Sequence, residues 1–223
     1  MPNDYDRAAD QPRIWYSRLL SDIDIFVDMD CVMTLNTLDD RIEYKNKYQR
    51  WEPDDRPNSP EHLFFSKGKN KIKASAKDAF QILNGYVVIS PKFRDLLQQF
   101  DLGSTRLIEV PIYRSDGKTL ADFPPHYILH VTETKSTLIP EESKNIKRPI
   151  PPGVSEPLPH ARWSAVYSTD ELTVKATSAD GVDLWADPIL RERLFLSDRL
   201  KQAIEANEIK SRGFDFVAAK VLR

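Results

Sequence analysis

The sequence contains a single cysteine, Cys31, and only seven glycines among its 223 residues. One cysteine cannot form an internal disulfide, and its isolation favours a reducing compartment. The scattered glycines form neither the phosphate-binding pattern GxxxxGKS/T nor the dinucleotide-binding pattern GxGxxG, and the HExxH and CxxC patterns are absent too. The sequence therefore offers no motif support for a nucleotide-binding protein, a zinc protease or a dithiol redox protein.

Long apolar runs are also missing. The longest, such as Ile23–Val27 and Tyr86–Ile89, have the length of strands, whereas about 20 apolar residues are needed to span a bilayer. The N-terminal residues are acidic and polar and do not resemble a secretory signal, so we expect a cytoplasmic protein without membrane contact. An excess of positive charge is absent, with 32 Lys and Arg against 34 Asp and Glu, which argues against direct binding of nucleic acid.

The composition that is present is typical of a folded globular protein, with 40% hydrophobic and 30% charged residues. Charge is unevenly distributed, because residues 1–60 hold eight Lys and Arg against thirteen Asp and Glu. We expect an acidic N-terminal region over residues 1–80 and an α+β domain over residues 81–223. One continuous domain fits equally, since the proline-rich segment 148–159 suits either a domain boundary or a loop within a domain.

Two segments, near residues 86–111 and 193–218, follow the same order of patterns. Each starts with a short apolar strand that ends in serine, continues with apolar residues at helical spacing and finishes with a second strand. Ser90 and Ser197 stand where a helix-capping oxygen accepts hydrogen bonds from the first free N–H groups. This repeated unit of strand, serine, helix and strand predicts an α+β fold with mixed sheets.

Hydrophobic periodicity and turn residues predict the remaining elements. Helices are expected near Asp10–Leu20, Ala74–Leu83, Pro91–Phe100 and Asp198–Ala206. Further strands are expected at Ile23–Val27, Thr105–Val110, Tyr127–Val131, Trp163–Tyr167, Leu172–Ala176 and Phe214–Val217.

The segment Ile25–Thr34 carries the sharpest catalytic pattern, an apolar strand followed by Asp28 and Asp30 in the order Asp-x-Asp. It resembles the first motif of the haloacid dehalogenase phosphatases, in which the first aspartate attacks phosphorus and the second acts as general acid and base. Such chemistry also needs a lysine and a later acidic pair to complete a magnesium site. The later pair is missing, so a magnesium-dependent phosphatase that uses Asp28 and Asp30 is an alternative interpretation only.

Acidic and apolar residues alternate over the same region, a pattern typical of a half-exposed strand with one acidic face. The acidic positions are Asp22, Asp24, Asp28 and Asp30. Such a face suits a basic protein partner, because complementary charge speeds encounter, and we expect these residues to bind a partner. Trp51 is the tryptophan that we expect to be partly exposed and to serve as an anchor for that partner.

Histidine gives no sign of a metal centre. His126 and His130 share one face of an expected strand, but no third ligand follows at a suitable spacing. We therefore expect no metal, no other cofactor and no catalytic residue.

Three segments carry a resemblance to a known family: YVVISPKFRDLLQQFDLG from Tyr86, then VPIYRSDGKTL with HYILHV, and finally the stretch that begins at Asp180 and includes an Asp-x-x-Leu-Trp type element at Asp180–Trp185. From residue 86 to the C-terminus the chain resembles a family of bacterial immunity proteins from polymorphic toxin systems. The resemblance implies an antidote without enzymatic activity that binds a cognate toxin in the cytoplasm of the producing cell. The acidic N-terminal region would suit a basic nuclease as that toxin. A general interaction adaptor without a toxin partner is a third interpretation.

Overall fold

Short strands and helices alternate along the chain, which confirms the expected α+β class. The structure is a computed structural model that describes residues 13–17, 19, 26–33, 35, 37–53, 60–66, 77–150, 153, 155–157, 162–165, 171–211 and 214–222. Of the expected acidic strand residues, Asp22 and Asp24 lie outside the described residues.

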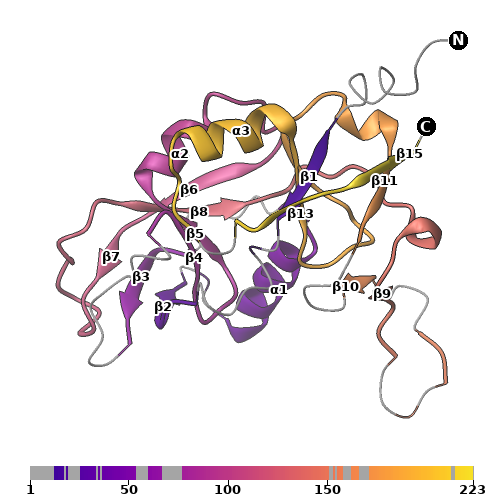
Figure 1. Cartoon of the computed structure of the whole chain (residues 1–223). Coiled ribbons are helices and arrows are strands. Elements are labelled where there is room, and N and C mark those ends of the chain that lie inside the picture. Colours follow the sequence, from indigo (N-terminus) through magenta and orange to yellow (C-terminus); the bar gives the residue numbers. More distant parts are fainter. Residues whose placement is uncertain are drawn as a thin grey trace, which may run out of the picture.

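Two four-stranded antiparallel sheets form the centre of the fold. The first has the order β4 (Ala79–Gln81), β5 (Val87–Ile89), β8 (His126–His130) and β6 (Arg106–Val110). The second has the order β12 (Leu184–Ala186), β13 (Leu194–Ser197), β1 (Ile14–Ser17) and β14 (Phe216–Ala218). Figure 1 shows the indigo strand β1 beside strands from the C-terminal part of the chain, so distant segments complete the second sheet.

The two sheets repeat one arrangement. β5 leads into α2 (Pro91–Leu97) and then β6, whereas β13 leads into α3 (Asp198–Ala206) and then β14. In each sheet, one central strand separates the strand before the helix from the strand after it. That central strand is β8 in the first sheet and β1 in the second. The structure therefore confirms the repeated unit expected near residues 86–111 and 193–218.

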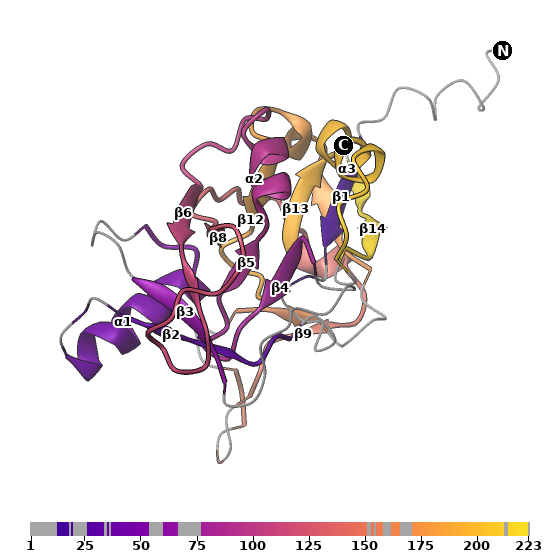
Figure 2. The same cartoon turned by 90° about the vertical axis from the view of Figure 1, so that its left-hand side faces the viewer.

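Both repeated helices begin at a serine that caps them. The Ser90 hydroxyl oxygen accepts a hydrogen bond from the Phe93 N–H, and the Ser197 oxygen accepts one from the Leu200 N–H, each at 3.2 Å. These bonds satisfy N–H groups that the first helical turn leaves free. α2 and α3 contact each other and lie together on one side of the strands in both views (Figures 1 and 2).

Helix α1 (Leu38–Gln49) lies on the other side of the β4-β5-β8-β6 sheet from α2. It begins after Thr37, whose side-chain oxygen accepts a hydrogen bond from the Asp40 N–H at 3.1 Å. Only Tyr44 and Tyr48, which are four residues apart on one face, are buried. Most of the helix surface is therefore polar and open to solvent.

Smaller sheets complete the fold. A three-stranded sheet contains β2 (Met29–Val32), β3 (His62–Phe65) and β7 (Ile112–Tyr113), in which β3 is antiparallel to β2 and parallel to β7. Two strand pairs follow, β9 (Ile146–Lys147) with β10 (Ser164–Ala165) and β11 (Thr173–Lys175) with β15 (Lys220–Leu222). The short 3₁₀ helices are η3 (Pro140–Glu142) and η5 (Ala176–Ala179).

Alternation along the strands divides the apolar core into three clusters. Both four-stranded sheets, α2 and α3 share the first cluster, which Leu194 and Leu196 enter from β13. Phe195, between these two leucines, points to the opposite face and stacks on Trp185 in a second cluster. A third cluster lies under α1 and joins the three-stranded sheet to the first four-stranded sheet. Successive residues of a strand thus enter different clusters because strand side chains alternate between faces.

Two expected helices are wrong where the structure describes them. Strand β1 occupies Ile14–Ser17 inside the expected helix Asp10–Leu20, and β4 occupies Ala79–Gln81 inside the expected helix Ala74–Leu83. β1 carries an aromatic and β-branched sequence that pairs on both edges, with β13 and with β14. β4 pairs with β5, and its residues Ala79 and Phe80 are both fully buried. Pairing with distant strands outweighs local helical spacing in both segments.

Five of the other expected strands are found, at β6, β8, β10, β11 and β14. Of the expected strand Ile23–Val27 the structure describes only Phe26 and Val27, and Phe26 forms an isolated bridge with Gln81 rather than part of a strand. Strand pairing crosses residue 80, because β1 lies between β13 and β14 and β3 pairs with β7. The division of the chain into residues 1–80 and 81–223 stays a prediction.

Candidate functional site

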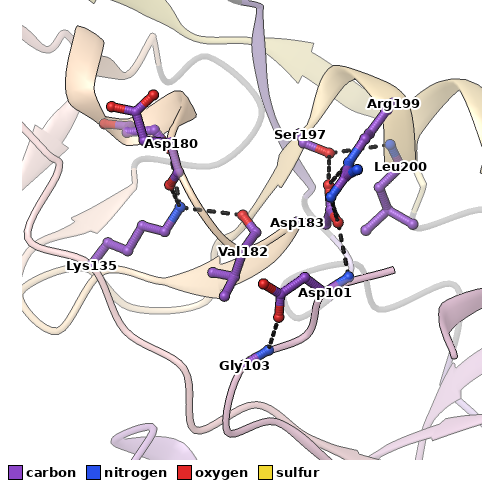
Figure 3. Close-up of polar contacts among 10 residues, drawn as sticks. Asp101, Gly103, Lys135, Asp180, Val182, Asp183, Ser197, Arg199 and Leu200 are labelled. Atoms are coloured by element: carbon purple, nitrogen blue, oxygen red, sulfur yellow. Dashed lines mark hydrogen bonds and ion pairs between the residues drawn. The ribbon is translucent and has the colours of Figure 1, made fainter. Parts of the chain in front are cut away.

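The Asp180–Trp185 element places a buried carboxylate beside the start of α3 (Figure 3). Asp183 is 1% exposed, and its carboxylate accepts hydrogen bonds from the Ser197 hydroxyl at 2.6 Å and from the Asp101 N–H at 3.0 Å. The exposed Arg199 guanidinium donates to the same carboxylate through Nη2 at 2.6 Å. Burial raises the pKa of Asp183, but the hydrogen bonds from Arg199, Ser197 and Asp101 together hold it below its ordinary value.

Asp78 occupies the equivalent place in the other repeat. Its carboxylate accepts hydrogen bonds from the Ser90 hydroxyl at 2.8 Å and from the Lys210 N–H at 2.7 Å. Asp101 follows α2 and Lys210 follows α3, so each aspartate binds the capping serine of its own repeat and the backbone that follows the helix of the other repeat. The Asp78 and Asp183 N–H groups complete the arrangement by donating to the Lys210 and Asp101 carbonyls. These contacts join the two repeats.

Lys135 fixes the turn that precedes Asp183. Its ammonium donates hydrogen bonds to the carbonyls of Ser178, Asp180 and Val182, at 3.2, 2.7 and 3.2 Å, and lies 4.0 Å from the centre of the Trp185 ring. Figure 3 shows this ammonium between Asp180 and Val182. The Asp180–Trp185 element, which is part of the family resemblance, is thus fixed through its backbone carbonyls and through the Trp185 ring.

The described part of the acidic strand has the expected alternation. Val27 and Met29 are buried in the cluster under α1, whereas Asp28 and Asp30 are partly exposed. One carboxylate oxygen of Asp30 accepts a hydrogen bond from the Cys31 N–H at 2.7 Å. Asp30 lies within β2, whose partner β3 is antiparallel, and among the described residues no group of three His, Cys, Asp or Glu could hold a metal ion. This setting gives no support to a magnesium site at Asp28 and Asp30.

Helix α1 and the turn between β4 and β5 lie beside β2. The Leu83 N–H donates to the Met29 carbonyl at 3.1 Å, and the Asn84 amide lies 2.9 Å from the Cys31 sulfur. Burial raises the pKa of Cys31 to about 11, against the opposing effect of two positive charges on α1, Arg41 and Lys45, which lie near enough to lower it. These contacts bring α1, β2 and the turn at 83–85 to one surface.

Apolar side chains are exposed on this surface. Of the seven large apolar side chains that are exposed among the described residues, four lie here: Val32, Leu38, Ile42 and Leu83. Leu38 is the most exposed of the seven, at 72%. The same segments carry five carboxylates, namely Asp28, Asp30, Asp39, Asp40 and Glu43, together with the cations Arg41 and Lys45. We call this set of four apolar and five acidic residues the α1–β2 surface.

Sequence reasoning missed α1 and with it most of this surface. The local signals were present: Thr37 with Asp40 three residues later is a helix-start pattern, and Tyr44 and Tyr48 are spaced four apart. They were weak because only these two tyrosines face the core, so the apolar stripe covers little more than one helical turn.

Trp51 is buried, and the expectation of partial exposure is wrong. Only 5% of it is exposed, its indole N–H lies 3.5 Å from the Leu190 carbonyl, and the Arg162 guanidinium lies 5.8 Å from its ring centre. Residues from distant parts of the chain supply this cover, so the neighbouring sequence gave no indication of it. A role as an anchor would require the cover to move.

The two histidines of β8 are buried in the core. His126 contacts the Pro124 carbonyl through Nδ1 at 2.9 Å, and burial lowers its pKa. His130 packs against the rings of Tyr44 and Tyr48. Both histidines thus have structural surroundings. No helix of the described residues is long and apolar enough to cross a membrane.

Comparison with known families assigns the chain. The profile of the Immunity protein family (Imm11) matches residues 22–221, so the match includes β2 and α1 as well as the segment after residue 86. Nothing in this match points to a phosphatase or to an adaptor. No curated protein matches the chain. Because the match covers most of the sequence, the chain belongs to the Imm11 immunity protein family, and its function is the neutralisation of a toxin.

Proposed function

We propose that the chain neutralises its toxin by stoichiometric, non-covalent binding through the α1–β2 surface. In this proposal it acts without catalysis, in the cytoplasm of the cell that makes both proteins, as the immunity partner of a polymorphic toxin system. The observation that carries the proposal is the concentration of exposed apolar side chains on α1, β2 and the turn at 83–85, in segments that also carry five carboxylates.

The apolar part of the surface suits the centre of a protein interface. A specific interface buries about 800 Å² per partner, with apolar side chains at its centre and charged ones at its rim. Contact of the exposed Val32, Leu38, Ile42 and Leu83 side chains with water is unfavourable, so covering them with a partner is favourable. Their support on α1 and β2 keeps them in place before binding, which lowers the entropic cost of association.

The acidic rim indicates the charge of the partner. Asp30 lies on β2 and Asp28 directly precedes this strand, whereas Asp39 and Asp40 lie in the first turn of α1, next to Leu38 in the sequence. Asp22 and Asp24 precede this strand in the sequence. Acidic residues attract a basic partner, so the proposal gives the toxin a basic surface, such as that of a nuclease. Complementary charge raises the association rate more than it prolongs the complex. Replacing Asp28 and Asp30 by asparagine then lowers the association rate at low salt and leaves the dissociation rate nearly unchanged.

Co-expression tests the function. The toxin-like protein encoded beside this gene is expressed in a bacterial host with and without the chain, and growth and co-purification are measured. The proposal predicts restored growth and a stable complex. Growth arrest that persists, with no complex, contradicts binding as the mode of protection.

Two matched substitutions test the surface. Ile42→Asp places a charge in the centre of the α1–β2 surface, whereas Ile150→Asp changes an equally exposed isoleucine elsewhere. Loss of a central contact costs about 2 kcal/mol or more, so Ile42→Asp should weaken toxin binding roughly thirty-fold or more. Ile150→Asp should bind as the unchanged chain does. Equal binding by both variants contradicts the surface while leaving the immunity function standing.

A further inference from the structure

A cavity of about 100 Å³ lies between the C-terminal end of α1, the turn between β4 and β5, and residues 191–192. Its lining is mixed: the rings of Tyr48 and Trp51 are accompanied by polar groups, namely Gln49, Gln81, Arg191 and Glu192, and by Gly85. A single water needs roughly 10 to 15 Å³ of such space, so the cavity has room for a small polar group. Mixed aromatic and hydrogen-bonding walls of this kind are typical of ligand sites.

The backbone around this cavity is strained. Among the described residues, four that are not glycine have a positive φ, and two of them, Trp51 at 64° and Glu192 at 60°, line this one cavity. The left-handed conformation is unfavourable for residues that carry a Cβ, and it persists where surrounding structure holds it. Trp51 is held by its burial and by Arg162, whose guanidinium donates hydrogen bonds to the Gln49 and Leu190 carbonyls, each at 2.7 Å.

Three guanidinium groups lie close together at this place. Arg162 donates hydrogen bonds to the carbonyls of Gln49 and Leu190, the residues that directly precede Arg50 and Arg191. Burial, together with the positive charges of Arg191 and Arg50, lowers the pKa of Arg162 to about 10. Among the described residues, neither Arg50 nor Arg191 has an ion-pair partner, and the buried Arg162 Nε–H has no hydrogen-bond acceptor. The site therefore carries positive charge that its own side chains do not neutralise.

Two carboxylates are near but do not balance this charge. Glu192 lines the cavity and Asp187 lies behind it. Asp187 is fully buried, and its carboxylate already accepts hydrogen bonds from the N–H groups of Thr137 and Leu138, both at 2.7 Å, and of Ile189. Hydrogen bonds from neutral N–H groups leave the charge of Asp187 in place, so three guanidinium groups against two carboxylates leave one positive charge in excess, which favours an anion.

We infer that this cavity binds an oxyanion, a carboxylate or a phosphate group, through Arg191 in its lining. The planar guanidinium matches the geometry of both groups and can donate two parallel hydrogen bonds to either. Gln49 supplies a further amide group on the same lining. The inference does not depend on the α1–β2 surface.

Calorimetric titration of the full chain tests the site, with inorganic phosphate and acetate as probes and chloride at equal ionic strength as the reference. The unchanged chain should bind at least one of the two probes at millimolar concentration. Arg191→Ala should weaken that binding at least tenfold, and Arg191→Lys should restore part of it, because lysine keeps the charge but not the fork. Arg114→Ala, which removes another exposed arginine, should bind as the unchanged chain does.

A second arm identifies the natural occupant. If Arg191→Ala also weakens toxin binding and phosphate competes with the toxin, a carboxylate of the toxin fills the site. If toxin binding is unchanged, the occupant is a free anion. The inference is overturned if neither probe binds the unchanged chain, or if Arg191→Ala binds the probe with unchanged affinity while retaining its thermal unfolding temperature.

Discussion

Replacing Asp183 by alanine should destabilise the fold strongly. The carboxylate is 1% exposed and accepts hydrogen bonds from the Ser197 hydroxyl and from the Asp101 N–H, the contacts that join the two repeats. A hydrogen bond to a charged group contributes about 1.5 to 3 kcal/mol, so losing these two predicts a loss of about 3 to 6 kcal/mol in the free energy of unfolding. The exposed Arg199 loses its partner as well.

Urea unfolding followed by tryptophan fluorescence measures this effect. With a slope of about 3 kcal/mol per molar urea, at the upper end of the usual range, the midpoint should fall by about 1 to 2 M. Asp180→Ala is the matched control, because Asp180 is exposed, and its effect should stay within about 0.5 kcal/mol. The reasoning is refuted if Asp183→Ala shifts the midpoint no further than Asp180→Ala does.

Three further predictions follow from other groups. The folded pKa of Asp183 lies below its unfolded value of about 3.9, so its ionised form stabilises the fold above that pH. This contribution is lost as the pH falls through the folded pKa. In Asp183→Asn, the free energy of unfolding should therefore decrease less steeply as the pH is lowered into this range. Gly103→Ala should cost more than Gly117→Ala in thermal unfolding, because both have a positive φ but only at Gly103 would a Cβ meet the Glu133 side chain, at 2.3 Å. The thiol of Cys31, whose pKa burial raises to about 11, should react with iodoacetamide at pH 8 far more slowly in the folded than in the unfolded chain, and equal rates would contradict its burial.

Capping and repetition were predictable from the sequence because they depend on local order. Ser90 and Ser197 each follow a short apolar strand and precede residues at helical spacing, and both cap helices in the structure. The joining aspartates also have a local signal, since Asp78 and Asp183 each stand two residues before a buried aromatic residue. That signal becomes meaningful only when the two repeats are compared.

Long-range pairing limited the rest of the prediction. Strand β1 fits between β13 and β14, whose residues come some 180 to 200 positions later, so nothing near β1 indicates a central strand. The burial of Trp51 likewise depends on Arg162 and Leu190. Most of the α1–β2 surface was missed because α1 carries its apolar residues Leu38 and Ile42 on the outside, against the usual pattern of an amphipathic helix.

Hydrogen exchange of the chain alone and in complex with its toxin tests the central claim most directly. If the toxin binds the α1–β2 surface, backbone N–H groups of α1 and β2 and of the turn at 83–85 should exchange more slowly in the complex. Residues of β9 and β11, far along the chain from this surface, serve as the internal reference and should be unchanged. Protection confined to those reference strands, with none in α1 or β2, would contradict the proposed mode of neutralisation.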